Sequence, residues 1–321
     1  MITVMFSSYN GGDRLRRTLE SMTRARAPRG GWRLVVVDNR STDGSYRVMS
    51  SFAGALPIEV LREAGPGKNR ALNRALEVAL ADDASDLFVF CDDDVLVAED
   101  WLEAWRGIAD ANPGFDVFAG LTAPAWPAEP PDWILRYVRM GVVFGVHEAV
   151  KEGSCDPRLV YGTNMAVRAR AFRTGIRFNQ EIGPNGSQSY PMGSETELVL
   201  RLVGLGHTCW FAPQAKVLHI IRPEQLEPAW ILKRAYRFGH GSGSMGEPHA
   251  MAITRDRIAL KNTLKGLIYP WLLPLLPWKQ SWSRHWQWAY DRGYEDGIRA
   301  VSKPRLSVLI KPGSPSGGRP L

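Results

Sequence analysis

The first 120 residues alternate short apolar runs, rich in β-branched residues, with segments of helical periodicity. A chain with this pattern buries its apolar runs most simply as strands of a parallel sheet that is covered by helices. We therefore expect an α/β fold with a mostly parallel central sheet. The expected strands span 2–6, 34–37, 58–61, 87–90 and 117–119.

Helices are expected in the gaps between these strands. The first should cover 15–21 with Asp13 as its cap, and the second should begin after Thr42 or Asp43. A third is expected over 69–80, where apolar residues recur at helical spacing.

The second half of the chain is less regular. Four prolines in 122–131 predict a loop and a change of subdomain. We expect a basic amphipathic helix over 230–238, a flexible linker over the Gly/Ser-rich 239–246, and further helices to about residue 299. Residues 301–321 are rich in proline and glycine, which predicts a disordered tail.

Charge and cysteine content limit the class of partner and compartment. There are 40 Lys and Arg against 33 Asp and Glu, a formal net charge of +7. This favours acidic partners such as nucleic acid, anionic lipid or phosphorylated substrates. Cys91, Cys155 and Cys209 have no CxxC spacing, which excludes a disulfide framework and a cysteine-rich zinc site and favours a reducing compartment. The first residues reach a polar segment too soon for a signal peptide, so we expect a cytoplasmic protein.

The longest apolar stretch, 266–278, is shorter than the about 20 residues that span a bilayer, and three prolines interrupt it. It predicts no membrane span, but it could lie on a membrane surface. Tryptophans interleave with basic residues in and after this stretch, a combination typical of membrane interfaces. These residues are Trp271, Trp278, Lys279, Trp282, Arg284, Trp286, Trp288 and Arg292.

Three consecutive carboxylates, Asp92 to Asp94, directly follow the apolar run 87–90 and Cys91. Adjacent like charges repel, so a cation would stabilise them. Alternate residues of an extended chain point to one side, roughly 7 Å apart, so Asp92 and Asp94 could face one ligand. Mg²⁺ and Mn²⁺ suit such oxygen ligands. A solvated acidic turn is the alternative, but ligands bind at the carboxyl ends of strands in α/β sheets, which favours a site.

Two other expected strands also end in polar residues. Ser7 and Tyr9 follow the first strand, and Asp38 and Asn39 follow the second. Polar groups at three strand ends are typical of a ligand pocket. Asn39 could bind a nucleobase or ribose, or it could only stabilise a turn.

Six motifs occur in one order over residues 1–225, and by them the chain resembles the family 2 glycosyltransferases, which are inverting enzymes of the GT-A fold. The motifs are Val-Met-Phe-Ser-Ser-Tyr-Asn at 4–10, Val-Val-Asp-Asn-Arg-Ser-Thr-Asp-Gly at 36–44, Gly-Pro-Gly-Lys-Asn-Arg-Ala-Leu-Asn at 65–73, Phe-Cys-Asp-Asp-Asp-Val-Leu at 90–96, Gly-Thr-Asn-Met-Ala-Val-Arg at 162–168 and Gly-Ser-Glu-Thr-Glu-Leu at 193–198. The resemblance implies a Rossmann-like, GT-A type sheet and a nucleotide-diphosphate sugar as donor.

The resemblance also implies roles for individual residues. Ser7, Tyr9, Asp38 and Asn39 would frame the nucleobase and ribose, Asp92 and Asp93 would approach the ribose and phosphate, and Asp94 of this DXD motif would bind Mg²⁺ or Mn²⁺. Many relatives have Asp where this chain has Asn39, which leaves the nucleobase open. Residues 1–120 would form the nucleotide-sugar-binding half, 121–225 the acceptor-binding half, and 226–300 a helical segment that could lie on a membrane.

Glu195 aligns with the catalytic acid of the family and is the expected general base. Ser194 and Glu197 fit a capping box, so Glu197 is expected to be structural. A helix N-terminus lowers the basicity of Glu195, whereas burial beside the donor phosphates would raise it. The implied reaction transfers a sugar, with inversion, to a hydroxyl of a glycan or lipid-linked acceptor, as in polysaccharide biosynthesis.

Further residues have both a functional and a structural interpretation. Lys68 and Arg70, in a Gly-rich turn before a helix, could bind the diphosphate or be solvated charges. His219 could be a metal or diphosphate ligand, or a core residue with a satisfied hydrogen bond. Trp126, Trp133 and Tyr137 could stack on sugar rings or simply pack.

Two other functions fit parts of the sequence. One is a noncatalytic, basic protein that binds membrane surfaces or nucleic acid, and the other is a nucleotidyltransferase on a related fold. A nicotinamide-dependent oxidoreductase is disfavoured, because the GxGxxG pattern at 241–246 follows no expected strand. We expect a transferase without a specific nucleic-acid partner.

Overall fold

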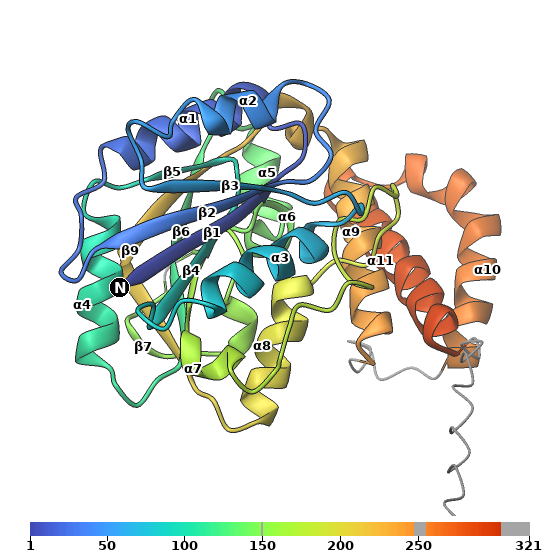
Figure 1. The fold of residues 1–321 in the computed structure, drawn as a ribbon. Helices are drawn as coiled ribbons and strands as arrows, with labels where there is room; N and C mark the ends of the chain where they lie inside the picture. The colour runs from blue at the N-terminus through green and yellow to red at the C-terminus, as the bar shows by residue number, and fades with distance from the viewer. Residues whose placement is uncertain (149, 247–254, 303–321) are drawn as a thin grey trace, which may run out of the picture.

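The computed structural model describes residues 1–148, 150–246 and 255–302, which form an α/β unit with a smaller helical unit on one side (Figure 1). The α/β unit is built on a nine-stranded sheet of order β3-β2-β1-β4-β8-β6-β9-β5, with β7 paired to β9. This arrangement confirms the predicted fold class and the helical C-terminal extension. The predicted tail over 301–321 falls outside the described residues from 303 onward.

The first four strands of the chain are parallel neighbours in the sheet. They are β1 (Ile2–Ser8), β2 (Trp32–Asp38), β3 (Ile58–Arg62) and β4 (Leu87–Cys91). Each was predicted, and each runs slightly further than its apolar run. β1, β2 and β4 consist mainly of buried residues, because helices cover both faces of the sheet.

The other strands run in mixed directions. β8 (Asn164–Arg168) is antiparallel to both β4 and β6 (Val117–Ala125), and β9 (Cys209–Ile220) is parallel to β6. The short strands β5 (Val95–Val97) and β7 (Gly153–Ser154) are antiparallel to β9. β6 and β9 therefore run in the direction of the first four strands, so the sheet is mostly parallel.

β6 continues to Ala125, although a loop was expected over 122–131. It continues because β9 resumes pairing with it beyond an irregularity at Gly120. Asn164, which is fully buried, fills this irregularity and donates from Nδ2 to the carbonyl oxygen of Ala215 at 2.7 Å. Proline-rich composition thus located the loop correctly but placed its start too early.

Helices cover both faces of the sheet. One face packs against α1 (Gly12–Thr23), α2 (Ser45–Ser50) and α4 (Trp101–Ala111), and the other against α3 (Lys68–Leu80), α7 (Ala169–Phe172) and α8 (Ser194–Gly204). Alternate residues of β1 serve the two cores, with Val4 and Phe6 in the first and Met5 in the second. This is the period-two alternation of a strand buried on both sides.

The predicted starts of the first two helices are wrong by a few residues. Gly11 caps α1, and Asp13 lies within its first turn. Gly44 caps α2, in place of the predicted Thr42 or Asp43. Gly44 has a φ of 90°, a left-handed conformation that glycine adopts without strain, and sequence patterns alone do not reveal it.

The helical unit follows the α/β unit in the chain. Short helices α5 (Asp132–Tyr137) and α6 (Met140–Phe144) lead toward it, and α9 (Pro228–Ser244), α10 (Arg255–Leu272) and α11 (Trp278–Ser302) form it. Three turns of 3-10 helix lie at Pro157–Leu159, Pro223–Leu226 and Leu273–Leu275. In the part of the chain that the structure describes, no helix combines the length and apolar character needed to cross a bilayer.

The predicted flexible linker over 239–246 is instead largely helical, because its glycines let α9 pack closely on α11. A Cβ at Gly239 or Gly243 would overlap the backbone of Tyr290 or Tyr294. Glycines on α11 make the reciprocal contacts, with Gly293 against Tyr236 and Gly297 against His240. Small residues four apart on both helices are a known means of close helix approach. The partner of these glycines lies some fifty residues away, so local composition gave no sign of it.

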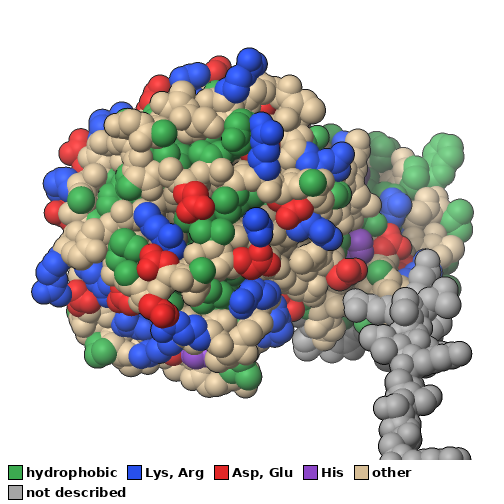
Figure 2. All heavy atoms as spheres, viewed as in Figure 1, with side chains coloured by type: hydrophobic (Ala, Val, Ile, Leu, Met, Phe, Trp, Pro, Cys, Tyr) green, Lys and Arg blue, Asp and Glu red, His purple; other side chains and the backbone are tan. Residues whose placement is uncertain are grey.

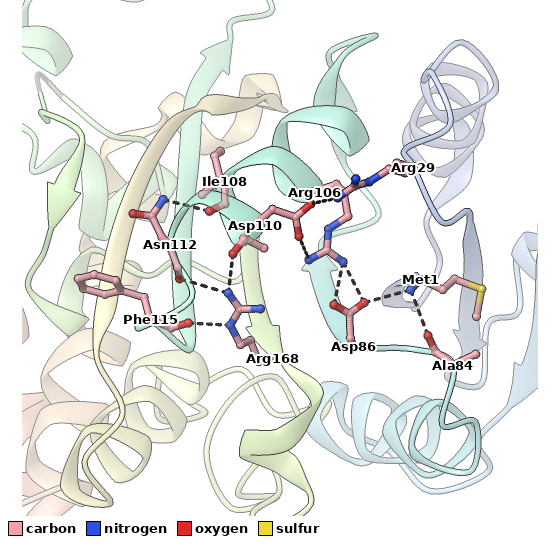
Figure 3. Close-up of polar contacts among 11 residues, drawn as sticks. Met1, Arg29, Ala84, Asp86, Arg106, Ile108, Asp110, Asn112, Phe115 and Arg168 are labelled. Carbon is pink, nitrogen blue, oxygen red and sulfur yellow. Dashed lines mark hydrogen bonds and ion pairs between the residues drawn. The ribbon is translucent and has the colours of Figure 1, made fainter.

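A polar network ties the amino ends of the parallel strands to α4 (Figure 3). Arg106 donates from Nη1 to both carboxylate oxygens of Asp86, at 2.9 and 2.8 Å, and pairs through Nη2 with Asp110 at 2.7 Å. The N-terminal ammonium of Met1 also bonds to Asp86 at 3.0 Å. Nearby, Arg168 donates to the carbonyl oxygen of Phe115. The first four groups pair among themselves, whereas Arg168 bonds to backbone carbonyl oxygens, and all lie at the edge of the sheet opposite to the carboxyl ends of the strands.

Replacing Gly239 with alanine should destabilise the protein by about 1–3 kcal/mol, because the added methyl group meets the backbone of α11. Alanine at an exposed helical glycine normally stabilises by about 1 kcal/mol. Gly107→Ala in α4, where a Cβ would meet no atom within 4 Å, is therefore a matched control with the opposite expected sign. Urea unfolding of both variants measures the difference, and a stabilised Gly239→Ala protein would refute the close contact.

Candidate active site

The carboxyl ends of β1, β2 and β4 open into a cavity of about 440 Å³, the first cavity. Its lining includes Ser7, Tyr9, Asn39, Lys68 and the three carboxylates Asp92 to Asp94. In Figure 1 the arrows of β1 and β2 point from the N-terminus toward the side on which α9 lies. The structure therefore brings together polar residues from three strand ends, as the sequence predicted.

A second cavity, of about 370 Å³, adjoins the first. Its lining includes Glu195 at the start of α8, Tyr161, Tyr190, and two residues of α9, Arg234 and Phe238. Lys68 and Asp92 line both cavities. Pro184 lines both cavities too, so Lys68 and Asp92 are the charged side chains at the boundary between the carboxylate cluster and Glu195.

Each of the three carboxylates has a different partner. Asp92 accepts a hydrogen bond from Lys68 Nζ at 2.7 Å, and Asp93 accepts one from the hydroxyl of Ser8. Burial and the neighbouring Asp94 raise the pKa of Asp93 to about 7. Burial alone would raise the pKa of Asp94 as well, but His219 and nearby arginines hold it below the ordinary value.

His219 lies between two groups that only accept hydrogen bonds. Its Nδ1 is 2.6 Å from the carbonyl oxygen of Phe144, and its Nε2 is 3.3 Å from Asp94 Oδ1. Nδ1 must carry a proton to bond to the carbonyl, so neutral His219 would direct a lone pair at a carboxylate. The contact with Asp94 thus calls for a second proton on the imidazole or for a cation between the two side chains. Burial would lower the pKa of His219, but Asp94 raises it above the ordinary value, in agreement with the first alternative.

The chemistry of this donor set fits a divalent ion of the Mg²⁺ or Mn²⁺ type. A carboxylate and an imidazole with its Nε2 available are acceptable ligands for Mn²⁺. Within residues 1–148, 150–246 and 255–302, no three His, Cys, Asp or Glu side chains converge as a metal cage. Such ions are commonly held by one or two protein ligands together with substrate phosphates. Asp94 and His219 therefore suit a site that a phosphorylated ligand completes.

Glu195 is held by two hydrogen bonds. Its Oε1 accepts from Lys68 Nζ at 2.8 Å, and its Oε2 accepts from the hydroxyl of Ser194 at 2.7 Å. Burial would raise the pKa of Glu195, but Lys68 and Ser194 more than offset this effect, and the pKa lies below its ordinary value. Burial would lower the pKa of Lys68, but Asp92 and Glu195 raise it far above its ordinary value. The lysine is therefore a cation shared by two carboxylates.

The predicted capping box at the start of α8 is wrong. Gly193, in the left-handed region with a φ of 108°, occupies the cap position, and Ser194 is the first helical residue. Glu197 does not reach back to the cap but binds Arg201, one turn later, at 2.7 Å. Its predicted structural role holds, although through a different partner. Ser194 is thereby free of a capping role and bonds to Glu195.

The loop before α8 is tied to α3, which carries Lys68 at its first position. The backbone N–H of Lys68 bonds to the carbonyl oxygen of Pro184 at 2.8 Å. Asn69 donates to the carbonyl oxygens of residues 179 and 182, and Asn73 exchanges two hydrogen bonds with the backbone of Phe178. This loop therefore fixes the position of Glu195 relative to Lys68.

Three residues that were predicted to bind the donor either bond to a neighbouring turn or lie outside the lining of the first cavity. The side chain of Asn39 is occupied by the turn at 65–67, because it donates to Gly65 O at 2.6 Å and accepts from Gly67 N at 2.9 Å. Asp38 is buried at the end of β2 and is absent from the lining of the first cavity. Arg70 is exposed, lies over Gly65 and lines neither cavity.

Trp126, Trp133 and Tyr137 pack against a hydrophobic cluster that joins α5 and α6 to α9 and α11. Trp133, for example, lies 4.9 Å from Trp282, ring centroid to ring centroid. The packing interpretation of these aromatic residues is therefore the one that the structure supports.

Sequence reasoning missed Ser8 and Arg222 beside the carboxylates, and it missed most of the lining of the second cavity. Ser8 is the hydrogen-bond partner of Asp93, and Arg222 lies with Nη1 4.0 Å from Asp94 Oδ2. Both lie at or just beyond strand ends, so the rule that located Asp94 could have found them. Arg234, on α9, lines the second cavity but carries no such signal, because its place depends on how α9 docks.

Comparison with known proteins agrees with this geometry. Residues 3–124 match the model for glycosyl transferase family 2. The chain is 25% identical over 233 residues to the succinoglycan biosynthesis protein ExoM of Rhizobium meliloti, an alignment that covers 72% of this chain and 71% of ExoM. It is 26% identical over 248 residues to the glycosyltransferase AglE of Haloferax volcanii, covering 75% of this chain and 72% of AglE.

A solved structure shares the fold. The mannosyltransferase PcManGT from Pyrobaculum calidifontis, in complex with GDP-Man and Mn²⁺, superposes with a TM-score of 0.60 at 18% identity. The match covers 92% of this chain and 86% of PcManGT. The GT-A type fold expected from the sequence is therefore confirmed.

The contribution of Asp93 to the stability of the metal-free protein should fall as the pH rises from about 4 to about 7, because folding raises the pKa of Asp93 to about 7. Within this window the folded state holds a proton that the unfolded state has released, so the free energy of unfolding falls with increasing pH. The expected loss is a few kcal/mol. Urea unfolding of the wild type and Asp93→Asn across this range tests it. Parallel curves for the two proteins would show that Asp93 does not titrate there.

Proposed function

The chain is a glycosyltransferase with a family 2 domain at residues 3–124, and we propose that it moves a sugar, with inversion, from a nucleotide-diphosphate sugar to a hydroxyl of a glycan or lipid-linked acceptor. One observation carries this proposal. The carboxylates of the first cavity and Glu195 of the second cavity meet at a shared boundary, which includes Lys68 and Asp92. A donor and an acceptor bound in adjoining cavities would bring their reacting atoms together at this boundary.

The donor is assigned to the first cavity. Ser7 and Tyr9 would contact the nucleobase and ribose, with Asp38 and Asn39 shaping this end from the tip of β2. Asp92 and Asp93 would approach the ribose and phosphate. Lys68 supplies a permanent cation for the diphosphate, and Arg70 could reach it only by leaving its position over Gly65.

Asp94 and His219 would hold the divalent ion, Mg²⁺ or Mn²⁺. When bound, this ion would neutralise the charge that develops on the departing nucleoside diphosphate. The Mn²⁺ in the PcManGT complex agrees with this assignment. Two neighbouring residues contact this carboxylate cluster. Ser8 donates a hydrogen bond to Asp93, and the guanidinium of Arg222 lies beside Asp94.

Glu195 is proposed as the general base. It would accept the proton of the acceptor hydroxyl while the new glycosidic bond forms and the bond from the anomeric carbon to the phosphate oxygen breaks. The electron pair of the broken bond leaves with the nucleoside diphosphate. Attack from the side opposite to the leaving group inverts the configuration at the anomeric carbon.

The acceptor is assigned to the second cavity. Its wall combines aromatic rings, at Tyr161, Tyr190 and Phe238, with the guanidinium group of Arg234. Rings of this kind stack on sugars, and a guanidinium suits hydroxyl or acidic groups of a glycan. The acceptor site would thus extend beyond the predicted acceptor-binding half, 121–225, into α9. Polysaccharide biosynthesis is the proposed context, as the name of ExoM indicates for that relative.

The two alternative functions are not favoured. A noncatalytic basic protein would not need a family 2 domain, and relatives named as a glycosyltransferase and a polysaccharide biosynthesis protein argue against a nucleotidyltransferase. No specific nucleic-acid partner is proposed.

We also propose that α10 attaches the protein to the inner face of a membrane. Large apolar side chains are exposed along α10 and the turn after it, with Trp271 and Leu275 each 80% exposed. Leu260, Leu264, Leu267 and Ile268 continue this surface, and Figure 2 shows hydrophobic side chains at the outer edge of the helical unit. The sequence of α10 carries four basic residues and one acidic residue, which favours anionic lipid. Three free cysteines agree with a cytoplasmic location.

Glu195→Gln should lower turnover by roughly 10²–10⁴-fold, because the amide cannot accept the proton, while donor binding is retained. Turnover is measured as release of nucleoside diphosphate, and binding as a thermal shift with a panel of nucleoside diphosphates and Mn²⁺. Asp94→Ala is the matched variant and should lose the Mn²⁺-dependent part of the shift. Unchanged turnover in Glu195→Gln would remove the base assignment, and an unchanged shift in Asp94→Ala would remove the metal site.

Trp271→Ser combined with Leu275→Ser should weaken binding to phosphatidylglycerol vesicles by at least about tenfold, because each side chain contributes about 1.5–3 kcal/mol when buried. Co-sedimentation with vesicles measures the binding. Leu205→Ser, at an exposed leucine outside the helical unit, is the control. Equal binding by all proteins would contradict the membrane proposal. A wild-type dimer in light scattering that the double variant abolishes would instead assign this surface to a second copy of the chain.

A further inference from the structure

Lys68 occupies an unusual position between the two cavities. Its ammonium lies 2.7 Å from Asp92 Oδ1 and 2.8 Å from Glu195 Oε1, and its side chain is 19% exposed. Asp92 belongs to the cavity assigned to the donor, and Glu195 to the cavity assigned to the acceptor. One flexible cation therefore bridges the two halves of the proposed reaction.

This bridge is unfavourable for a general base. An effective base has a pKa close to the working pH. In the ligand-free protein, one oxygen of Glu195 accepts from Lys68 and the other from Ser194, and the pKa of Glu195 lies below its ordinary value. Glu195 is thus weakly basic as long as Lys68 stays beside it.

We propose that Lys68 couples donor binding to the activation of Glu195, because the diphosphate of the donor draws the ammonium away from the base. The proposal rests on the proposed function, in which Glu195 is the base and the first cavity holds the donor. Lys68 is then a positioning residue for Glu195 as well as a contact of the diphosphate.

The chemistry of the competing anions supports this exchange. A diphosphate spreads its negative charge over several oxygens that can accept from the ammonium, and the four-carbon stem of lysine lets the ammonium turn toward them without movement of α3. The backbone N–H of Lys68 stays fixed to Pro184 O, so only the side chain needs to move. Glu195 has other contacts that hold its place, because its side chain lies closely against Gly162 and its Oε2 accepts from Ser194 at 2.7 Å.

The exchange also resets the site after each transfer. During transfer, the proton of the acceptor hydroxyl passes to Glu195, and Lys68 neither gains nor loses a proton. When the nucleoside diphosphate departs, Lys68 returns to Glu195 and favours its ionised form. The proton is then released to water, and the base is again held inactive until the next donor binds.

Other charged groups near Glu195 do not provide the same link. The charged and titratable side chains that line the cavity of Glu195, Lys68 included, are Lys68, Asp92, Arg158, Tyr161, Tyr190 and Arg234. Among these, Lys68 and Asp92 also line the first cavity, and Asp92 is an anion. The link between the cavities therefore depends on the lysine.

The test is the uptake of protons when a nucleoside diphosphate binds. GDP and UDP, each with Mn²⁺, are titrated into the protein by calorimetry in buffers of different ionisation enthalpy between about pH 4 and 6, near the ordinary pKa of a glutamate. The wild type should take up more protons than Glu195→Gln, because loss of Lys68 raises the pKa of Glu195. The ligand phosphates and Asp93 titrate alike in both proteins and cancel in the difference. Equal uptake by the two proteins would overturn the coupling.

Two lysine variants sharpen the result. Lys68→Met should abolish the difference in proton uptake, and its turnover should begin at higher pH than that of the wild type at low donor concentration. Lys68→Arg should restore part of the difference, because it keeps the charge. Arg74→Met, an exposed cation on the same helix, should behave as the wild type. Retained turnover in Glu195→Gln would defeat the proposed function, whereas lost turnover with equal proton uptake would defeat only the coupling.

Discussion

The charge balance at the carboxyl ends of β1, β2 and β4 is the constraint on which the site depends. Three carboxylates and a glutamate are gathered in a partly buried space, which is unfavourable unless cations lie beside them. Lys68 compensates Asp92 and Glu195, and His219 with Arg222 compensates Asp94. Burial and the neighbouring Asp94 raise the pKa of Asp93 to about 7, although the hydroxyl of Ser8 and the charge of Arg14 act in the opposite direction.

The rest of the fold brings these charged groups together from distant parts of the chain. Lys68 comes from the start of α3, His219 from the end of β9, and Glu195 from α8. The asparagines of α3 bind the loop before α8, and Asn164 fills the irregularity between β6 and β9. At the opposite edge of the sheet, Arg106 closes a separate network with Asp86 and Asp110 (Figure 3).

Much of this could be predicted from the sequence where the signal is local. Strand-end carboxylates such as Asp94 follow from an apolar run and a parallel sheet, and Glu195 from its motif. Features that depend on a distant partner could not be predicted. The glycines around Gly239 indicated a linker because α11 follows some fifty residues later, and Ser194 resembled a cap because the conformation of Gly193 is not visible in the sequence. The role of Asn39 in the turn at 65–67 likewise required the position of that turn.

The contact of α9 with the loop before α8 has a mechanical consequence. Gly241 lies against the backbone of Met192, and the carbonyl oxygen of Arg237 accepts the N–H of Met192 at 3.0 Å, while α9 packs on α11 through its glycines. These contacts join the helical unit directly to the segment that carries Glu195. If α10 rests on a lipid surface, the mouth of the acceptor cavity stands at a set height and tilt above it. Such an enzyme would select its acceptors by length. It would use glycans whose growing end reaches that height above the membrane, in preference to shorter or longer ones.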